Sequence, residues 1–371
     1  MYNIIFILLS LSIFFSYFSL GGVRLIVPFV FSLYIVLFFC KFKNSKVTIK
    51  YSYDMVFYGI ILFFIFCYSL LTSFYDIIFS GILFGLILYW PYFLNKNIDI
   101  SRVNDFLKIH SLFATMLSIG VILQFFLFKK FGIEFGKLDI RDSRIGFGFI
   151  WLDFSFLSLY LVASIPLIYS TNFSIYSKLS LTFILVFGSF ITTARTGLFA
   201  LLFTLSFIIL VYLFFSLYKG YINRKISVFM ILLISLFSYF YLKVSSLSER
   251  EMTLDDNGRF DGYKSAINYS FENVFFGAQF NPDLYKITVD VLPHNIFVYN
   301  LTMGGGVFFI FFVLWLIILY LGDIHNNNKF IKISFLICLI GMQFIPSTFS
   351  TFFFALIISM AKFQKFTGEL K

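Results

Sequence analysis

The chain has 371 residues, a formal net charge of +10, 60% hydrophobic residues and only 12% charged residues. Soluble domains carry about 25% charged residues, so this chain has too few charged side chains to cover a water-facing surface. Apolar segments of about 20 residues recur along it, and each is long enough to cross a bilayer as a helix. A transmembrane barrel would instead show alternating segments of about ten residues. The composition predicts an all-α, polytopic integral membrane protein and excludes a soluble enzyme.

We expect about twelve membrane-spanning helices in a single transmembrane domain over residues 1–371. The first apolar segment has no basic residue before it and no small-residue cleavage site, so we interpret it as a helix rather than a signal peptide. In chain order, the expected spans are 2–20, 23–40, 55–73, 75–94, 109–128, 149–170, 179–194, 197–217, 226–243, 295–321, 332–346 and 347–361.

Basic residues in the short connections predict the orientation of these spans. Lysines and arginines follow the second, fourth, eighth and twelfth spans, beginning at Lys41, Lys96, Lys219 and Lys362. Short basic connections favour the cytoplasmic side. An even number of spans then places both termini in the cytoplasm. The opposite side receives two polar loops, at about 129–148 and 244–294.

The first outer loop, 129–148, carries five lysines and arginines against three acidic residues. Excess cations on the outer face are suited to binding an anionic substrate. Arg141 and Arg144 are the candidates here. The alternative is that these side chains contact lipid phosphates or hydrate the loop.

Arg195 stands in the segment 192–197, between two expected spans at their outer ends. A charged side chain near hydrocarbon depth is unfavourable, so it usually faces a cavity or a partner. Threonine hydroxyls neighbour it, and Gly197 permits a close approach of backbone. The alternative is an arginine that snorkels to the lipid headgroups.

Arg259 follows the turn-forming residues 255–258, which predict the start of a helix. Apolar side chains recur three and four positions apart over 260–267, as in a short amphipathic helix resting on a membrane surface. An arginine in the first turn opposes the helix macrodipole, and a bound anion would resolve that conflict. The alternative is a solvated surface arginine. Lys264 lies in the same stretch and is a further candidate for substrate binding.

His294 lies between Pro293 and Asn295, where the polar loop meets the tenth expected span. An imidazole titrates near neutrality and can accept a proton from a hydroxyl group. A lone histidine is more often structural or solvated, but this one stands where a lipid-linked headgroup would be presented. His294 is therefore the candidate proton acceptor, and Asn295 is a candidate substrate contact.

No metal site and no cofactor are expected. The chain has three histidines, widely separated in the sequence, and the outer acidic residues lack the spacing of metal ligands. A Walker-type phosphate loop is also absent from the sequence. Without a metal, a departing pyrophosphate needs cationic side chains, which favours arginines.

The segment 193–201 reads Thr-Ala-Arg-Thr-Gly-Leu-Phe-Ala-Leu. It resembles the Ser-Arg-x-Gly-Leu-x-Ala-Leu segment of the bacterial O-antigen polymerases (Wzy type) and O-antigen ligases. Ala194 replaces the usual serine of that family.

Two later parts of the chain resemble the same superfamily. Residues 258–260 begin its amphipathic stretch, and 273–277 resemble the closing Pro-Leu-Phe-Gly. Residues 293–295 and 303–306 resemble its His-Asn pair and the glycine-containing helix that follows. The resemblance covers about residues 190–315, whereas the first 180 residues match only in being hydrophobic.

The resemblance implies a GT-C-like, metal-independent, inverting glycosyltransferase. It would act on undecaprenyl-pyrophosphate-linked glycan at the periplasmic face of the bacterial inner membrane. Arg195 and Arg259 would bind the pyrophosphate, and His294 would assist the attacking hydroxyl. Arg141 and Arg144 would hold a second headgroup or the glycan. The expected partners are the lipid-linked glycan, the bilayer, a chain-length regulator and other polysaccharide-assembly proteins, but no nucleic acid.

A polymerase of lipid-linked repeat units is the favoured interpretation, since high Phe and Ile content suits the AT-rich loci that encode such enzymes. An O-antigen ligase would share the donor but transfer the glycan to lipid A-core, and the motifs do not separate the two. A flippase or transporter for the same lipid is the alternative from a different class. It would carry charged residues within its spans, and the expected spans are nearly free of charge.

Overall fold

The computed structural model describes residues 2–20, 22–42, 52–94, 101–141, 144–218, 228, 235, 239, 259–287, 289, 292–345 and 347–368. Within them the chain is mostly helical, and five helices are long and apolar enough to cross a membrane. The protein is therefore a mostly α-helical membrane protein, as predicted. The five helices are Tyr53–Thr72, Asp76–Phe93, Ser101–Phe131, Arg195–Tyr212 and Ile296–Ile324.

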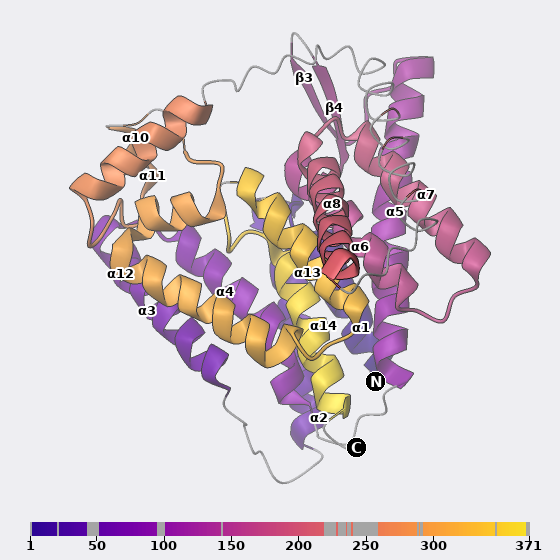
Figure 1. Cartoon of the computed structure of the whole chain (residues 1–371), viewed down its shortest axis with the longest axis horizontal. Coiled ribbons are helices and arrows are strands. Elements are labelled where there is room, and N and C mark those ends of the chain that lie inside the picture. The colour runs from indigo at the N-terminus through magenta and orange to yellow at the C-terminus, as the bar shows by residue number, and fades with distance from the viewer. Residues whose placement is uncertain are drawn as a thin grey trace.

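The α-helices of the described residues form two groups with α13 and α14 between them (Figure 1). Helices α3, α4 and α12 lie on one side, and α1, α5, α6 and α7 lie on the other. Nearly every residue of α6 is buried, because α5, α7, α8 and α13 all pack against it. The helices are α1 (Tyr2–Phe14), α2 (Ile26–Phe42), α3 (Tyr53–Thr72), α4 (Asp76–Tyr89), α5 (Ser101–Phe131), α6 (Phe154–Tyr169), α7 (Ile175–Ile191), α8 (Arg195–Tyr218), α10 (Arg259–Glu272), α11 (Pro282–Lys286), α12 (Ile296–Leu319), α13 (Lys329–Gly341) and α14 (Phe352–Gly368).

The predicted count of twelve spans is not confirmed. Several expected spans correspond to apolar helices of 10–17 residues, such as α1, α6 and α7. The expected span 226–243 contains only isolated described positions. Helix α5 begins at Ser101 rather than at 109, because its polar first turns carry no hydropathy signal.

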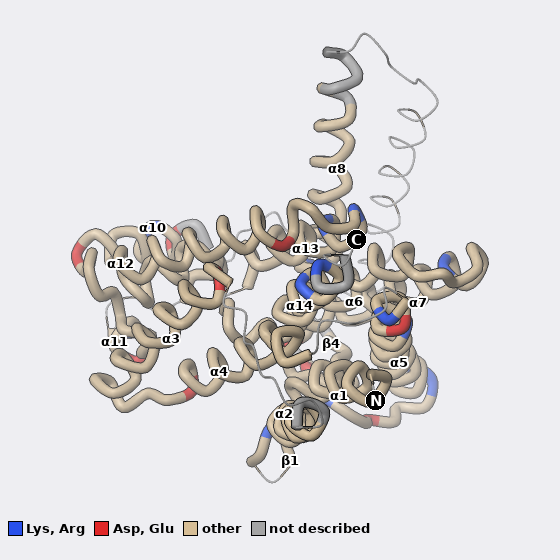
Figure 2. The backbone as a smooth tube through the Cα atoms, turned by 90° about the horizontal axis from the view of Figure 1, so that it is seen from below, with Lys and Arg blue, Asp and Glu red and all other residues tan. Residues whose placement is uncertain are grey.

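Helix α8 extends away from the body of the bundle, and the body helices carry few charged residues (Figure 2). Its apolar side chains Phe203, Phe207 and Leu210 are exposed. In a membrane protein such side chains can face the hydrocarbon of the lipids, where no water has to be displaced from them.

The described residues are mostly helical, in agreement with the all-α prediction, and they contain in addition two small antiparallel two-stranded sheets. Strands β1 (Ser19–Leu20) and β2 (Val23–Arg24) follow α1. Strands β3 (Lys137–Arg141) and β4 (Arg144–Phe149) form a hairpin within the predicted loop 129–148. Apolar residues alternate along this hairpin and pair across it, with Leu138 opposite Phe147 and Ile140 opposite Ile145. Such alternation is typical of a β-strand. The segment is too short to be predicted as a membrane span.

Helix α12 is broken at Gly305, whose φ of 76° and ψ of 172° lie outside the helical region. A Cβ atom at this position would lie 2.3 Å from the carbonyl oxygen of Phe275. Glycine tolerates both the positive φ and the close backbone approach. A broken helix in a membrane protein needs new partners for the freed backbone groups.

The segment 274–280, directly after α10, supplies those partners. Ser270, one turn earlier, also places its hydroxyl 3.0 Å from the hydroxyl of Thr302. The two segments that resemble the same superfamily, 273–277 and 303–306, therefore touch through their backbones. Three backbone hydrogen bonds join 274–280 to 302–306: Gly306 N–H to Val274 O at 2.6 Å, Ala278 N–H to Thr302 O at 3.0 Å and Phe280 N–H to Met303 O at 2.9 Å.

We predict that Gly305→Ala lowers the free energy of unfolding by about 2–4 kcal/mol, because the methyl group would meet the Phe275 carbonyl and the backbone would be strained. The measurement is reversible denaturation of the detergent-solubilised protein. Gly59→Ala is the matched control, since a Cβ on this residue of α3 meets nothing within 4 Å. Equal stability of the two variants would contradict the conclusion that the contact between 274–280 and α12 stabilises the fold.

A buried ion-pair network joins α3, α14 and the π-helical turn Tyr320–Ile324 that follows α12. The ammonium of Lys362 lies 2.6 Å from Asp54 Oδ2 and also forms a close ion pair with Asp323. The side chains of these three residues are 0–5% exposed. Lys365 adds a second cation at 3.5 Å from Asp323, and the ring of Tyr89 lies 5.2 Å from the Lys362 ammonium. Lys362, expected from the sequence in a surface connection, is buried because α14 continues past it.

Lys362→Met should destabilise the fold by about 3–5 kcal/mol, since it leaves two buried carboxylates without their shared cation. Combining it with Asp54→Asn and Asp323→Asn should restore much of the loss. Lys365→Met is the control, because that side chain is 47% exposed. If Lys362→Met unfolds no more easily than Lys365→Met, the network does not stabilise the bundle.

Candidate functional site

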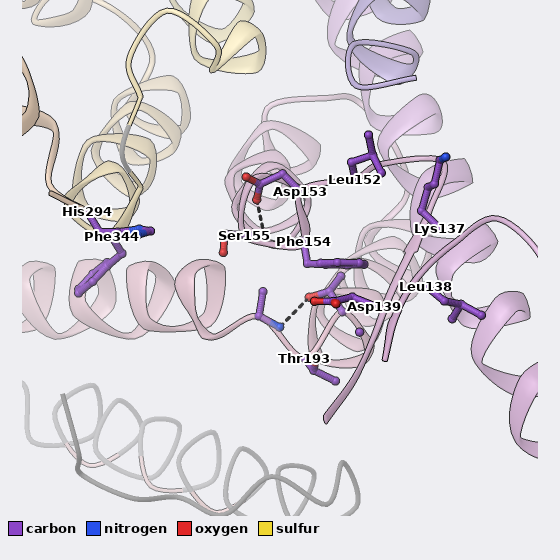
Figure 3. Close-up of a pocket in the computed structure, with 13 residues that line it drawn as sticks. Lys137, Leu138, Asp139, Leu152, Asp153, Phe154, Ser155, Thr193, His294 and Phe344 are labelled. Carbon is purple, nitrogen blue, oxygen red and sulfur yellow. Dashed lines mark hydrogen bonds between the residues drawn. The ribbon is translucent and has the colours of Figure 1, made fainter. Parts of the chain in front are cut away.

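A cavity of about 540 Å³ lies where the ends of several helices meet. Five segments line it: the β3–β4 hairpin, the loop before α6, the turn between α7 and α8, His294 shortly before α12, and Phe344 between α13 and α14. Figure 3 shows the side chains around it. Its polar side chains include Lys137, Asp139, Asp153, Ser155, Thr193 and His294.

The turn between α7 and α8 is tightly held. The Thr192 hydroxyl donates to the Ser189 carbonyl at 2.8 Å and accepts from the Ala194 N–H at 3.3 Å. Thr193 has a φ of 59°, which reverses the chain at this point. From α6, the Ser158 hydroxyl donates to the Ala194 carbonyl at 3.2 Å. These contacts fix the start of α8 against α6.

Arg195 is the first residue of α8, and the Ala194 before it lines the cavity. The close approach expected at Gly197 is confirmed, since a Cβ there would lie 2.3 Å from the Ser158 carbonyl oxygen. Arg195 thus stands at the positive end of a helix dipole, beside the cavity. A helix N-terminus led by a guanidinium is a favourable place for an anion.

His294 lines the same cavity, opposite the turn that leads to Arg195. Asn295 caps α12, because its side-chain oxygen accepts the N–H groups of Phe297 at 2.9 Å and Val298 at 3.1 Å. The Tyr263 hydroxyl donates to the His294 carbonyl at 3.0 Å. His294 is therefore held from the helix that follows it and from α10.

Helix α10 is described from Arg259 onward, and the predicted turn 255–258 lies outside the described residues. Tyr263, one turn further along, is the residue that contacts the His294 backbone. The side chain of Arg259 also lies outside the described part of the structure. The N-termini of α8 and α12 and the first described turns of α10 lie near His294.

None of the remaining predicted residues is among the described side chains that line the cavity. Lys264 is exposed on α10. Arg141 and Arg144 face each other at the tip of the β3–β4 hairpin, and their side chains fall outside the described residues. The hairpin instead brings Lys137 and Asp139 to the cavity.

Two carboxylates of the cavity were not singled out from the sequence. Asp139 comes from β3, and Asp153 is the N-cap of α6. Asp153 Oδ1 accepts the N–H groups of Ser155 at 2.9 Å and Phe156 at 3.0 Å. An aspartate directly before an apolar helix predicts an N-cap, so Asp153 could have been identified from the sequence. No local sequence pattern places Asp139 beside it.

Burial raises the pKa of Asp153, and the two backbone N–H groups oppose that rise only in part. The carboxyl therefore binds a proton more readily when folded than when unfolded. Among the described residues, no group of three or more His, Cys, Asp or Glu side chains is arranged to hold a metal ion.

Comparison of the chain with protein-family models, with curated proteins and with solved structures gives no match. The functional assignment therefore depends on the residues of the site and on the resemblance of the three segments described above.

The raised pKa of Asp153 predicts how stability depends on pH. A carboxyl whose pKa is higher in the folded state stabilises the protein fully below its unfolded value of about 3.8, and that contribution is lost as the pH rises through the folded value. Asp153→Asn keeps a good N-cap and cannot ionise. Relative to the wild type, its melting temperature should be lowest at acidic pH and should rise as the pH passes through the folded value, because the amide never has to bury a charge. A constant difference from pH 3.5 to 8 would contradict the raised pKa.

Proposed function

We propose that the protein is a polymerase that joins polyprenyl-pyrophosphate-linked oligosaccharide repeat units, as the Wzy-type O-antigen polymerases do. One observation carries this proposal: His294 and the turn that leads to Arg195 lie on one cavity, although about 100 residues of sequence separate them. The segments that carry the resemblance thus contribute to a single place on the protein.

The two arginines are suited to binding the pyrophosphate of the donor. Arg195 begins α8, so its guanidinium and the free N–H groups of the first turn both favour an anion. Arg259, the first described residue of α10, is expected to do the same. A pyrophosphate held there is stabilised as it departs with its negative charge.

His294 is suited to accepting the proton of the acceptor hydroxyl. As that oxygen bonds to the anomeric carbon of the donor, the carbon–oxygen bond to the pyrophosphate breaks, and its electron pair leaves with the pyrophosphate. The hydroxyl proton passes to the imidazole. Attack from the side opposite the leaving group inverts the anomeric carbon. The chain's own arginines compensate the departing charge in this scheme.

The placement of the connections supports the predicted orientation. The residues that line the cavity lie in the connections that precede α6, α8, α12 and α14. In a twelve-span arrangement, all of these connections lie on the same side of the membrane. Lys362, Asp323 and Lys365 lie toward the other ends of α14 and α12. We place the cavity on the periplasmic face of the bacterial inner membrane, with both termini in the cytoplasm.

The charged network within the bundle is an observation that would favour a transporter. Its members are paired with one another and nearly fully buried, and none of them lines the cavity. Asp323 lies at the far end of the α12 segment from His294. This arrangement suits a structural ion pair better than a route for a lipid headgroup. A ligase shares every feature of the donor site and differs only in its acceptor.

We predict that His294→Ala and Arg195→Ala each lower the rate of glycan polymerisation by at least about 100-fold, since each removes a group that acts on the reacting atoms. The measurement is a gel profile of surface glycan from a deletion strain that expresses each variant at matched level. Surface glycan should stop at one repeat unit.

His325→Ala and Arg102→Ala are the matched controls, because His325 and Arg102 are exposed and absent from the cavity lining. Both should give the wild-type ladder. Loss of all attached glycan, with long lipid-linked chains accumulating, would show a ligase instead. A normal ladder from both site variants would reject the proposed mechanism.

A further inference from the structure

The described charges around the cavity suit a phosphate poorly. Among the described side chains, the lining contains two carboxylates, Asp139 and Asp153, and one ammonium, that of Lys137. Placing a pyrophosphate between two carboxylates would bring like charges together at close range. The groups that favour an anion, Arg195 and the N-terminus of α8, begin just beyond the lining residue Ala194.

The cavity suits the hydroxyl groups of a sugar. Carboxylate oxygens, the Ser155 and Thr193 hydroxyls and the His294 imidazole all line it, so donors and acceptors are both present. Its volume of about 540 Å³ lies within the range of about 300–1,000 Å³ that is usual for sites of small ligands.

Asp153 has one oxygen occupied and one available within this part of the structure. Oδ1 accepts both capping N–H groups, and no described residue donates a hydrogen bond to Oδ2. Figure 3 shows the carboxylate and the His294 ring directed at the same open space from different elements. The cap holds the carboxylate rigidly, so Oδ2 is pre-positioned for a ligand hydroxyl.

We propose that this cavity is the subsite for the acceptor glycan and that Asp153 Oδ2 accepts a hydrogen bond from a hydroxyl of the acceptor sugar. This assignment rests on the proposed function. Asp153 holds the acceptor sugar while His294 takes the proton of the attacking hydroxyl. The pyrophosphate of the donor binds outside the cavity, at the arginine-led helix ends.

Asp153→Asn separates this role from helix capping, because asparagine caps a helix as well as aspartate does but carries no charge. The assay uses the full-length protein in lipid nanodiscs. Its substrate is the lipid-linked precursor extracted from cells that lack the gene. Two probes measure the subsites separately: inorganic pyrophosphate, and the lipid-free oligosaccharide released from that precursor by mild acid.

We expect Asp153→Asn to lower the transfer rate at subsaturating precursor and the affinity for the free oligosaccharide by about 10- to 100-fold, the usual effect of losing a hydrogen bond to a charged group. Its affinity for pyrophosphate and its melting temperature near neutral pH should match the wild type. Arg195→Ala should show the reverse, with weaker pyrophosphate binding and unchanged oligosaccharide binding. Asp105→Asn, an exposed residue paired with Arg102, should change nothing.

Transfer by Asp153→Asn within twofold of the wild type would overturn the assignment and leave Asp153 as a helix cap alone. Equal losses of pyrophosphate and oligosaccharide binding would also overturn it, because the subsites would then not be separate. In both cases loss of transfer in His294→Ala would leave the proposed function standing. A wild-type protein that transfers none of the extracted glycan would overturn the proposed function and the subsite together.

Discussion

The position of His294 depends on the contact between the broken helix α12 and the segment 274–280. Membrane helices rarely leave backbone groups unpaired, so the break at Gly305 is possible only because this segment donates and accepts the missing hydrogen bonds. The contact fixes the end of α10 and the start of α12 relative to each other. Tyr263 then reaches the His294 carbonyl from α10, and Asn295 caps α12 directly after His294.

The site separates charges of opposite sign. Arginines begin α8 and α10, whereas carboxylates line the cavity beside them. A lipid-linked glycan has the same division, with an anionic pyrophosphate joined to a sugar rich in hydroxyl groups. The match between the two arrangements is what the proposed function requires of this site. At the other end of the bundle, Lys362 and its carboxylates compensate one another and serve stability.

Composition and hydropathy predicted the membrane class, and the spacing of apolar residues over 260–267 predicted a helix that α10 includes. Other features depend on contacts between distant residues, which no local pattern encodes. The β3–β4 hairpin is too short to stand out, yet it brings Asp139 to the cavity. Lys362 is buried because α14 continues beyond the apolar run. Its partner Asp54 lies 308 positions away in the sequence, so no local pattern predicts this ion pair. The glycines at 304–306 stand out in the sequence. Their role is understood only from the structure, in which the segment 274–280 packs against them.

The proposed function is tested most directly by an experimental structure of the protein in a nanodisc with a lipid-linked glycan added. We predict the pyrophosphate against Arg195 and Arg259, sugar rings in the cavity beside Asp153, and His294 within hydrogen-bond reach of a sugar hydroxyl. A pyrophosphate bound between Asp139 and Asp153, or a glycan bound away from His294, would contradict this prediction.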